Sequence, residues 1–193
     1  MESMLKVGQQ SLLGYLPAIV IKEILEGNID YSKNLPAYSS IYTVSLFADI
    51  SGFTKLSEAF AKKGRIGPEF LAFSLNRYME QLINIIGKNG GDIFKFAGDA
   101  LLVVWPDNGK NNLTETCRRA VQCALDIQSK LNQREICVGK RLSVKIGIGI
   151  GEVRILFVGG QYNRCEYLIV GESMRQACEA ETHATDGGQT IIS

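Results

Sequence analysis

The stretch IYTVSLFADISGFT, residues 41–54, decides the fold of this chain of 193 residues. Its first ten residues are mostly β-branched, aromatic or aliphatic, which is typical of a buried strand. The segment Ser51-Gly52-Phe53-Thr54 interrupts the apolar run, and residues 55–61 continue as a helix. A carboxylate, Asp49, therefore stands where a strand ends and a helix is about to begin.

Apolar spacing along the rest of the chain predicts further helices and strands. The expected helices cover residues 68–86 and 114–132, with a last one from Gly171, and the expected strands cover residues 92–96, 101–105, 166–170 and 190–192. The composition of residues 97–100 predicts a hairpin turn. Residues 142–158 are predicted to form a strand pair bent around Gly149-Gly151. The order β-α-α-β-β-α-β-β-β-α-β predicts an α+β fold, with helices packed on one face of a mostly antiparallel sheet.

Residues 1–40 are expected to form an N-terminal extension with a short helix that begins near Pro17, and residues 41–193 to form one domain. The most apolar part of the extension, residues 12–25, is interrupted by Pro17 and by charged residues, and it is too short to span a bilayer. It also lacks the basic start and the small-residue cleavage site of a signal peptide. We therefore expect a cytoplasmic protein without a membrane segment.

The composition excludes several function classes. The net charge is +1, so no overall field favours binding to nucleic acid. The single histidine, His183, leaves little for zinc-hydrolase or Ser-His-Asp chemistry. The five cysteines lack the spacing of metal ligands and are expected to be reduced thiols. An anionic substrate would have to be held by local groups, such as metal ions or backbone amides.

Two aspartates stand at positions that a folded sheet can bring together. Asp49 ends the first strand, and Asp99 lies in the turn between two later strands. Carboxylates so placed suit one or two Mg²⁺ ions that also bind substrate phosphates. Each Asp alone also fits a structural role, one as a helix cap and the other as a turn residue. The small-residue turn after Asp49 favours the metal interpretation, because amides at a helix N-terminus bind phosphate groups.

Four segments together resemble the class III nucleotidyl cyclases. Residues 47–54 resemble the first metal-binding motif of this family, and residues 90–102 (GGDIFKFAGDALL) resemble the second. Residues 144–151 (VKIGIGIG) and 169–172 (IVGE) match its later strands. The resemblance extends over residues 41–193, and the chain looks most like the first of the two cyclase domains in soluble, bicarbonate-responsive adenylyl cyclases. It implies a ferredoxin-like cyclase domain with its active site at a dimer interface.

The resemblance implies that Asp49 and Asp99 are catalytic and hold two Mg²⁺ ions, or Mn²⁺ in their place. The carbonyl group of Ile50 would add a metal ligand. The phosphates of ATP would lie against the backbone amides of the turn, which are those of Ser51, Gly52, Phe53 and Thr54. The implied reaction converts ATP to 3′,5′-cyclic AMP and pyrophosphate, by in-line attack of the ribose 3′-hydroxyl on the α-phosphate.

Two positions depart from the family pattern. The complementary half of a cyclase site carries an Asn and, four residues later, an Arg on the last helix, and this Arg stabilises the transition state. Counted from Gly171, these positions hold Arg175 and Glu179 in this chain. The resemblance therefore implies a half that supplies the metal side and has little activity until a complementary cyclase domain completes the site.

Lys95 stands where some family members read adenine. In a first-type domain this position faces a second site, which in the bicarbonate-responsive group holds bicarbonate against the Lys and an Arg of the last helix. The candidates here are Lys95, Ile169 and Arg175, although a gap-free count from Gly171 places Cys178 at the Arg position. Lys95 also fits an ordinary strand lysine that reaches solvent.

Other functions fit some of the same residues. A non-catalytic module that binds nucleotide or bicarbonate and regulates a partner would explain the missing Asn and Arg, whereas the intact pair of Asp49 and Asp99 favours an enzyme. A guanylate cyclase half stays open, because the complementary domain mostly chooses the purine. A diguanylate cyclase is disfavoured, because its signature, which residues 90–94 resemble, belongs at a hairpin tip, and the tip here is at residues 97–100.

Overall fold

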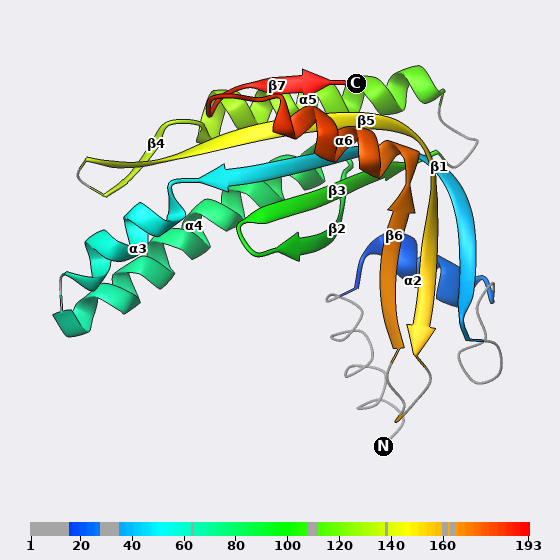
Figure 1. Cartoon of the computed structure of the whole chain (residues 1–193), viewed down its shortest axis with the longest axis horizontal. Coiled ribbons are helices and arrows are strands. Elements are labelled where there is room, and N and C mark those ends of the chain that lie inside the picture. Colours follow the sequence, from blue (N-terminus) through cyan, green and yellow to red (C-terminus); the bar gives the residue numbers. More distant parts are fainter. Residues whose placement is uncertain are drawn as a thin grey trace.

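The structure is a computed structural model that describes residues 16–27, 35–62, 64–107, 112–137, 139–159, 162 and 165–193. Its elements are α2 (Ala18–Leu25), β1 (Ala37–Ser51), α3 (Phe53–Ala61), the 3₁₀ turn η1 (Gly64–Ile66), α4 (Gly67–Lys88), β2 (Asp92–Ala97), β3 (Ala100–Pro106), α5 (Leu113–Leu131), β4 (Arg134–Cys137), β5 (Lys140–Gly159), β6 (Cys165–Gly171), α6 (Glu172–Thr182) and β7 (Thr190–Ile192). The α+β fold expected from the sequence is confirmed (Figure 1). None of the helices in these ranges has the length and hydrophobicity needed to cross a bilayer.

The strands of the described ranges form one seven-stranded sheet in which β1 and β5 lie side by side at the centre (Figure 1). The main path of the sheet is β2-β3-β1-β5-β4, and β6 and β7 also pair with β5. Every pair is antiparallel except β5 with β7. The mostly antiparallel sheet predicted from the pattern is therefore present.

The two central strands are longer than their apolar patterns indicate. β1 has 15 residues and β5 has 20, and the two strands pair along the whole length of β1. The strand pair expected within residues 142–158 is wrong, because these residues lie in one strand that β1 accompanies past Gly149-Gly151. The short strand β4 is an addition that the sequence pattern does not predict.

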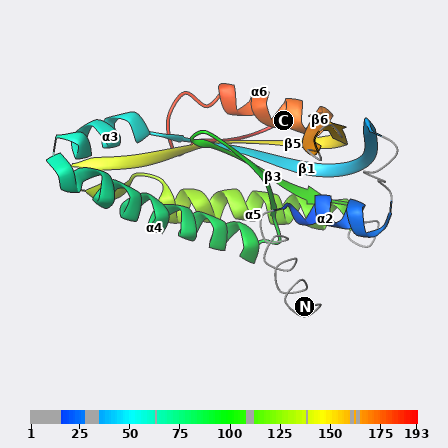
Figure 2. The same cartoon turned by 90° about the horizontal axis from the view of Figure 1, so that it is seen from below.

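Helices cover both faces of the sheet (Figure 2). α4 and α5 pack on one face over the main core, whose fully buried members include Leu46, Ile50, Leu82, Ile86, Ile127 and Ile146. The fold class holds, but α6 differs from the expectation of helices on one face, since it lies against the opposite face. The sequence hides this contact, because the buried residues of α6 are the small Ser173, Ala177 and Ala180, which pack over glycines of β5 rather than forming an apolar stripe.

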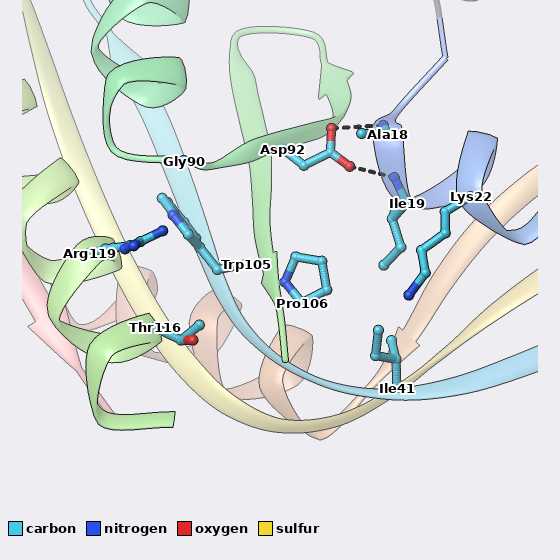
Figure 3. Close-up of a pocket in the computed structure, with 10 residues that line it drawn as sticks. All are labelled: Ala18, Ile19, Lys22, Ile41, Gly90, Asp92, Trp105, Pro106, Thr116 and Arg119. Carbon is cyan, nitrogen blue, oxygen red and sulfur yellow. Dashed lines mark hydrogen bonds between the residues drawn. The ribbon is translucent and has the colours of Figure 1, made fainter. Parts of the chain in front are cut away.

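The N-terminal helix α2 packs on a second, smaller core. The buried members of this second core are Ile19, Val20, Phe94, Leu102, Val104, Ile155 and Phe157. Asp92, at the start of β2, accepts hydrogen bonds from the backbone amides of Ala18 (3.0 Å) and Ile19 (2.8 Å) (Figure 3). A carboxylate at this position satisfies amides that have no partner within the helix. The helix expected near Pro17 is thus confirmed, and it is fastened to β2.

A cavity of about 330 Å³ lies beside α2 (Figure 3). Three charged side chains line it, and each has a partner within the chain. Asp92 binds the amides of α2, Lys22 Nζ lies 3.9 Å from Glu26 Oε1, and Arg119 Nε lies 3.0 Å from Glu115 Oε1. The cavity therefore lies between α2 and α5, and its three charged side chains are all engaged within the chain.

Replacing Gly149 by Ala should destabilise the fold by about 1–3 kcal/mol, the usual cost of overpacking a filled interior. An added Cβ would lie 2.3 Å from the carbonyl oxygen of Ser173 and 2.6 Å from the amide nitrogen of Ala177. Gly87→Ala in α4 is the matched control, because a Cβ there meets no atom within 4 Å. The control should gain about 0.5–1 kcal/mol from helix propensity. Urea unfolding measures both changes, and equal stability of the two variants would contradict the close packing of α6.

Candidate active site

The structure brings Asp49 and Asp99 together at the end of β1. Asp49 pairs with Ala100 of β3, so the hairpin turn that carries Asp99 lies beside it. The amide of Ile50 donates a hydrogen bond of 3.3 Å to the carbonyl oxygen of Asp99, which ties the turn to the strand. Asp49 is half-buried and Asp99 is exposed. The two carboxylates that the sequence singles out thus converge from the end of β1 and from the β2–β3 turn.

The surroundings of Asp49 disfavour its charged form. Burial raises the pKa of Asp49 above its ordinary value, and the negative charge of Asp99 raises this pKa further. Lys145, which lies opposite Asp49 on β5, lowers the pKa and offsets part of the effect. The raised pKa means that the folded chain destabilises the ionised carboxylate. A cation bound between the two aspartates would relieve that cost.

The turn after Asp49 brings the first backbone amides of α3 next to the end of β1. Gly52 precedes α3 with a φ of 101°, a conformation that glycine adopts without strain, and a Cβ at this position would lie 2.8 Å from the carbonyl oxygen of Arg141. Leu56 donates the first helical hydrogen bond back to Gly52. The amides of residues 53–55 therefore precede the helical ladder and stand at the positive end of α3. Ser51, the last residue of β1, completes the turn.

The donor atoms at this site suit a hard divalent cation. Asp49 and Asp99 contribute carboxylate oxygens, and the backbone of Ile50 contributes a carbonyl oxygen, which are the ligand types that Mg²⁺ and Mn²⁺ prefer. Within the described ranges, no group of three or more acidic, histidine or cysteine side chains is arranged to hold a metal ion. Two aspartates suffice for Mg²⁺ when substrate phosphates and water fill the remaining positions.

Two charged neighbours of Asp49 are not singled out by sequence analysis. Lys145 lies opposite Asp49, and Glu181 comes close from the last turn of α6. The pKa of Glu181 is raised, first by burial and then by Asp49, while Lys145 lowers it. The signal for Lys145 is visible, because it is the one charged residue in the apolar run VKIGIGIG. Glu181 gives no local signal, because only the packing of α6 brings it to the site.

The residues expected at a second site are only partly brought together. Lys95 of β2 and Ile169 of β6 lie beside the second core. Leu102 of β3, which pairs with Lys95, is buried in that core. Arg175 is exposed on α6, and its guanidinium group donates hydrogen bonds to Glu172 (2.5 Å) and Glu179 (2.6 Å). The guanidinium group of Arg175 is therefore engaged by two exposed carboxylates of its own helix in this structure.

The curved, mostly antiparallel sheet, the strand that carries Asp49 near its end and the hairpin turn that carries Asp99 define a nucleotidyl cyclase domain. The family model of the adenylate and guanylate cyclase catalytic domain matches residues 37–192, and the chain belongs to this family. The resemblance to class III cyclases is thereby confirmed.

Curated relatives include adenylate cyclases. Adenylate cyclase type 10 of Rattus norvegicus is 33% identical over 147 residues, which are 75% of this chain and 9% of that protein. The photoactivated adenylate cyclase subunit alpha of Euglena gracilis is 26% identical over 184 residues, which are 94% of this chain and 17% of that protein. The chain thus spans less than a fifth of the length of these two relatives.

Solved structures share the fold. The adenylyl cyclase CyaB from P. aeruginosa is 27% identical with a TM-score of 0.66, and the match covers 81% of this chain and 79% of that one. A guanylyl cyclase is 30% identical with a TM-score of 0.62, over 82% of this chain and 76% of that one. Both kinds of cyclase therefore have this architecture.

In the metal-free protein, Asp49→Asn should raise the melting temperature at neutral pH. A folded-state pKa above the unfolded value means that ionised Asp49 costs stability at any pH above the unfolded pKa. That cost disappears once the pH falls below the unfolded pKa, so the gain from the substitution should vanish in acid. Calorimetry in the presence of a chelator measures the change.

Asp126→Asn provides a control of opposite sign. Hydrogen bonds from Asn89 and Gln122 lower the pKa of Asp126, so ionised Asp126 contributes stability at neutral pH. This variant should melt at a lower temperature than the wild type. An Asp49→Asn protein that also melts lower would contradict the electrostatic description of the site.

Proposed function

We propose that this chain is the metal-binding half of an adenylate cyclase, which converts ATP to 3′,5′-cyclic AMP and pyrophosphate when a complementary cyclase domain pairs with it. The observation that carries the proposal is the convergence of Asp49 and Asp99 beside the first turn of α3. Groups for binding a metal ion and groups for binding phosphates adjoin there. The names of the two curated relatives support ATP as the substrate.

In this proposal Asp49 and Asp99 hold two Mg²⁺ ions, for which Mn²⁺ can substitute, and the carbonyl group of Ile50 adds a ligand. Bound ions of this kind lower the pKa of the ribose 3′-hydroxyl and neutralise charge on the departing pyrophosphate. The amides from Ser51 to Thr54 orient the terminal phosphates. The 3′-hydroxyl loses its proton to water, its oxygen attacks the α-phosphorus in line, and the bond from the α-phosphorus to the bridging oxygen of the β-phosphate breaks, so that pyrophosphate leaves.

The other side of the site must come from a second domain. The helix that carries the transition-state Arg in a complementary half corresponds to α6, where Glu179 occupies the Arg position in this chain. Arg175, one turn earlier, is held by Glu172 and Glu179. Two copies of the chain would therefore pair two metal sites with no cation to stabilise the transition state.

Location and regulation complete the proposal. Residues 41–193 would form the catalytic half and residues 1–40 its extension, in the cytoplasm, where ATP is available. Bicarbonate is proposed as a regulator on the basis of Lys95 and Ile169 alone, since Arg175 is engaged by carboxylates. A non-catalytic role for the same domain is less favoured, because a purely structural module has no use for two converging carboxylates, one of them with a raised pKa.

The chain alone should make little cyclic nucleotide, and a mixture with a complementary cyclase domain should be active. The reason is the missing transition-state cation, and an arginine in that role is worth about 1,000- to 100,000-fold in the rate of other phosphoryl-transfer enzymes. Production of cyclic nucleotide from ATP and from GTP in the presence of Mn²⁺ measures both the dependence on the partner and the choice of purine. High activity of the chain alone would contradict the half-site model, and a strict preference for GTP would favour a guanylate cyclase half.

Asp49→Asn and Asp99→Asn should each abolish metal-dependent turnover in the active mixture while leaving the fold intact. Each substitution removes a charged metal ligand but keeps the size of the side chain. The rate of cyclic nucleotide formation is measured across a range of Mg²⁺ concentrations, and circular dichroism reports folding. Asp186→Asn is a control on an exposed loop. Retained Mg²⁺-dependent activity in both active-site variants would contradict the metal assignment.

A further inference from the structure

The last turn of α6 lies over the strands that carry the site. A Cβ on Gly147 would lie 2.4 Å from the amide nitrogen of Glu181 and 3.0 Å from its Cβ, so α6 packs directly on β5 at this point. Side chains alternate along a strand, and Lys145 therefore points toward the same face as position 147, under α6. In the pairing of β1 with β5, Lys145 lies opposite Asp49. Glu181, Lys145 and Asp49 thus meet on one face of the sheet.

The charges at this place do not balance. Asp49, Asp99 and Glu181 contribute three negative charges and Lys145 contributes one positive charge, which leaves two negative charges in excess. Asp49, Lys145 and Glu181 are half-buried, and charges interact more strongly there than in bulk water. Such an excess suits a divalent cation, provided that the Lys145 ammonium group does not occupy the oxygens of Asp49.

Lys145 lies near the carboxylates of Asp49 and Glu181 and lowers the pKa of each. An ammonium group paired with Asp49 would compete with a metal ion for the same oxygens. Glu181 lies on α6, whereas Asp99 lies in the β2–β3 turn. Glu181 and Asp99 therefore approach Asp49 from different elements. Pairing of Lys145 with Glu181 would draw the ammonium group toward α6 and leave Asp49 to the metal ion.

We propose that Glu181 is a positioning residue of the metal site, which holds the Lys145 ammonium group and so keeps the Asp49 carboxylate available to a divalent cation. This inference rests on the proposed function, since it presupposes a metal ion at Asp49 and Asp99. In this proposal Glu181 does not bind the metal directly and acts through the Lys145 ammonium group. It acts as an outer partner, a kind of residue whose loss typically weakens metal binding about 10- to 100-fold.

Titration of the full chain with Mn²⁺ in a calorimeter at neutral pH tests the proposal. Glu181→Gln keeps the size of the side chain and removes its charge, and it should weaken Mn²⁺ binding about 10-fold. Glu179→Gln is the matched control, because Glu179 lies on the same helix but is exposed and bound to Arg175. The control should bind Mn²⁺ like the wild type. Melting curves without metal show that both variants are folded. Unchanged Mn²⁺ affinity in the Glu181→Gln protein would overturn the proposal.

Lys145→Met tests whether Glu181 acts through the lysine. In a double-mutant cycle, Glu181→Gln should change the Mn²⁺ affinity less in the Lys145→Met background than in the wild type, because the competing ammonium group is already absent. An equal effect in both backgrounds would overturn the positioning role, since Glu181 would then act by its charge alone.

Asp49→Asn in the same titration separates this inference from the proposed function. If Asp49→Asn removes Mn²⁺ binding and Glu181→Gln does not weaken it, only the role of Glu181 fails. If Mn²⁺ binding survives in Asp49→Asn, or is absent from the wild type, the metal site fails and this inference fails with it.

Discussion

The pairing of β1 with β3 on one side and with β5 on the other is the constraint on which the rest of the structure depends. The same residue, Asp49, is fixed opposite Ala100 and opposite Lys145, so the hairpin that carries Asp99 and the central strand β5 meet at one point. A register shift of one residue would turn Asp49 toward the opposite face, where Ala48 and Ile50 now pack in the core. The geometry of the site is therefore a consequence of the register of the sheet.

The packing of α6 on the sheet adds another charged residue to the site of the two aspartates. Gly147 and Gly149 let a helix of small buried residues lie on the strands, and this contact brings a third carboxylate, Glu181, to the site. Like charges at partly buried positions cost stability, as the raised pKa of Asp49 indicates. A protein tolerates such a cost where a bound cation offsets it, and functional sites are the usual place for it. The stability of the metal-free fold thus disfavours the negative charges at the end of β1, whereas the proposed function requires them.

Local patterns predict most elements and the two aspartates, because strand composition, turn residues and helix starts are properties of neighbouring residues. Asp49 at a strand end and Asp99 at a hairpin tip are examples. Features that depend on distant contacts escape such patterns. The full length of β5 follows from its pairing with β1, the position of α6 follows from glycines on another element, and the engagement of Arg175 follows from two glutamates on α6. Glu181 joins the site only through tertiary packing, so no sequence motif marks it.

The most direct test of the central claim is the position of the metal ions. Crystals of the chain grown with Mn²⁺ and a non-reactive ATP analogue would show the ions by anomalous scattering. We expect anomalous density within metal–oxygen bonding distance of both Asp49 and Asp99, with the terminal phosphates against the first turn of α3. Density that contacts neither aspartate, or phosphates bound away from that turn, would contradict the claim.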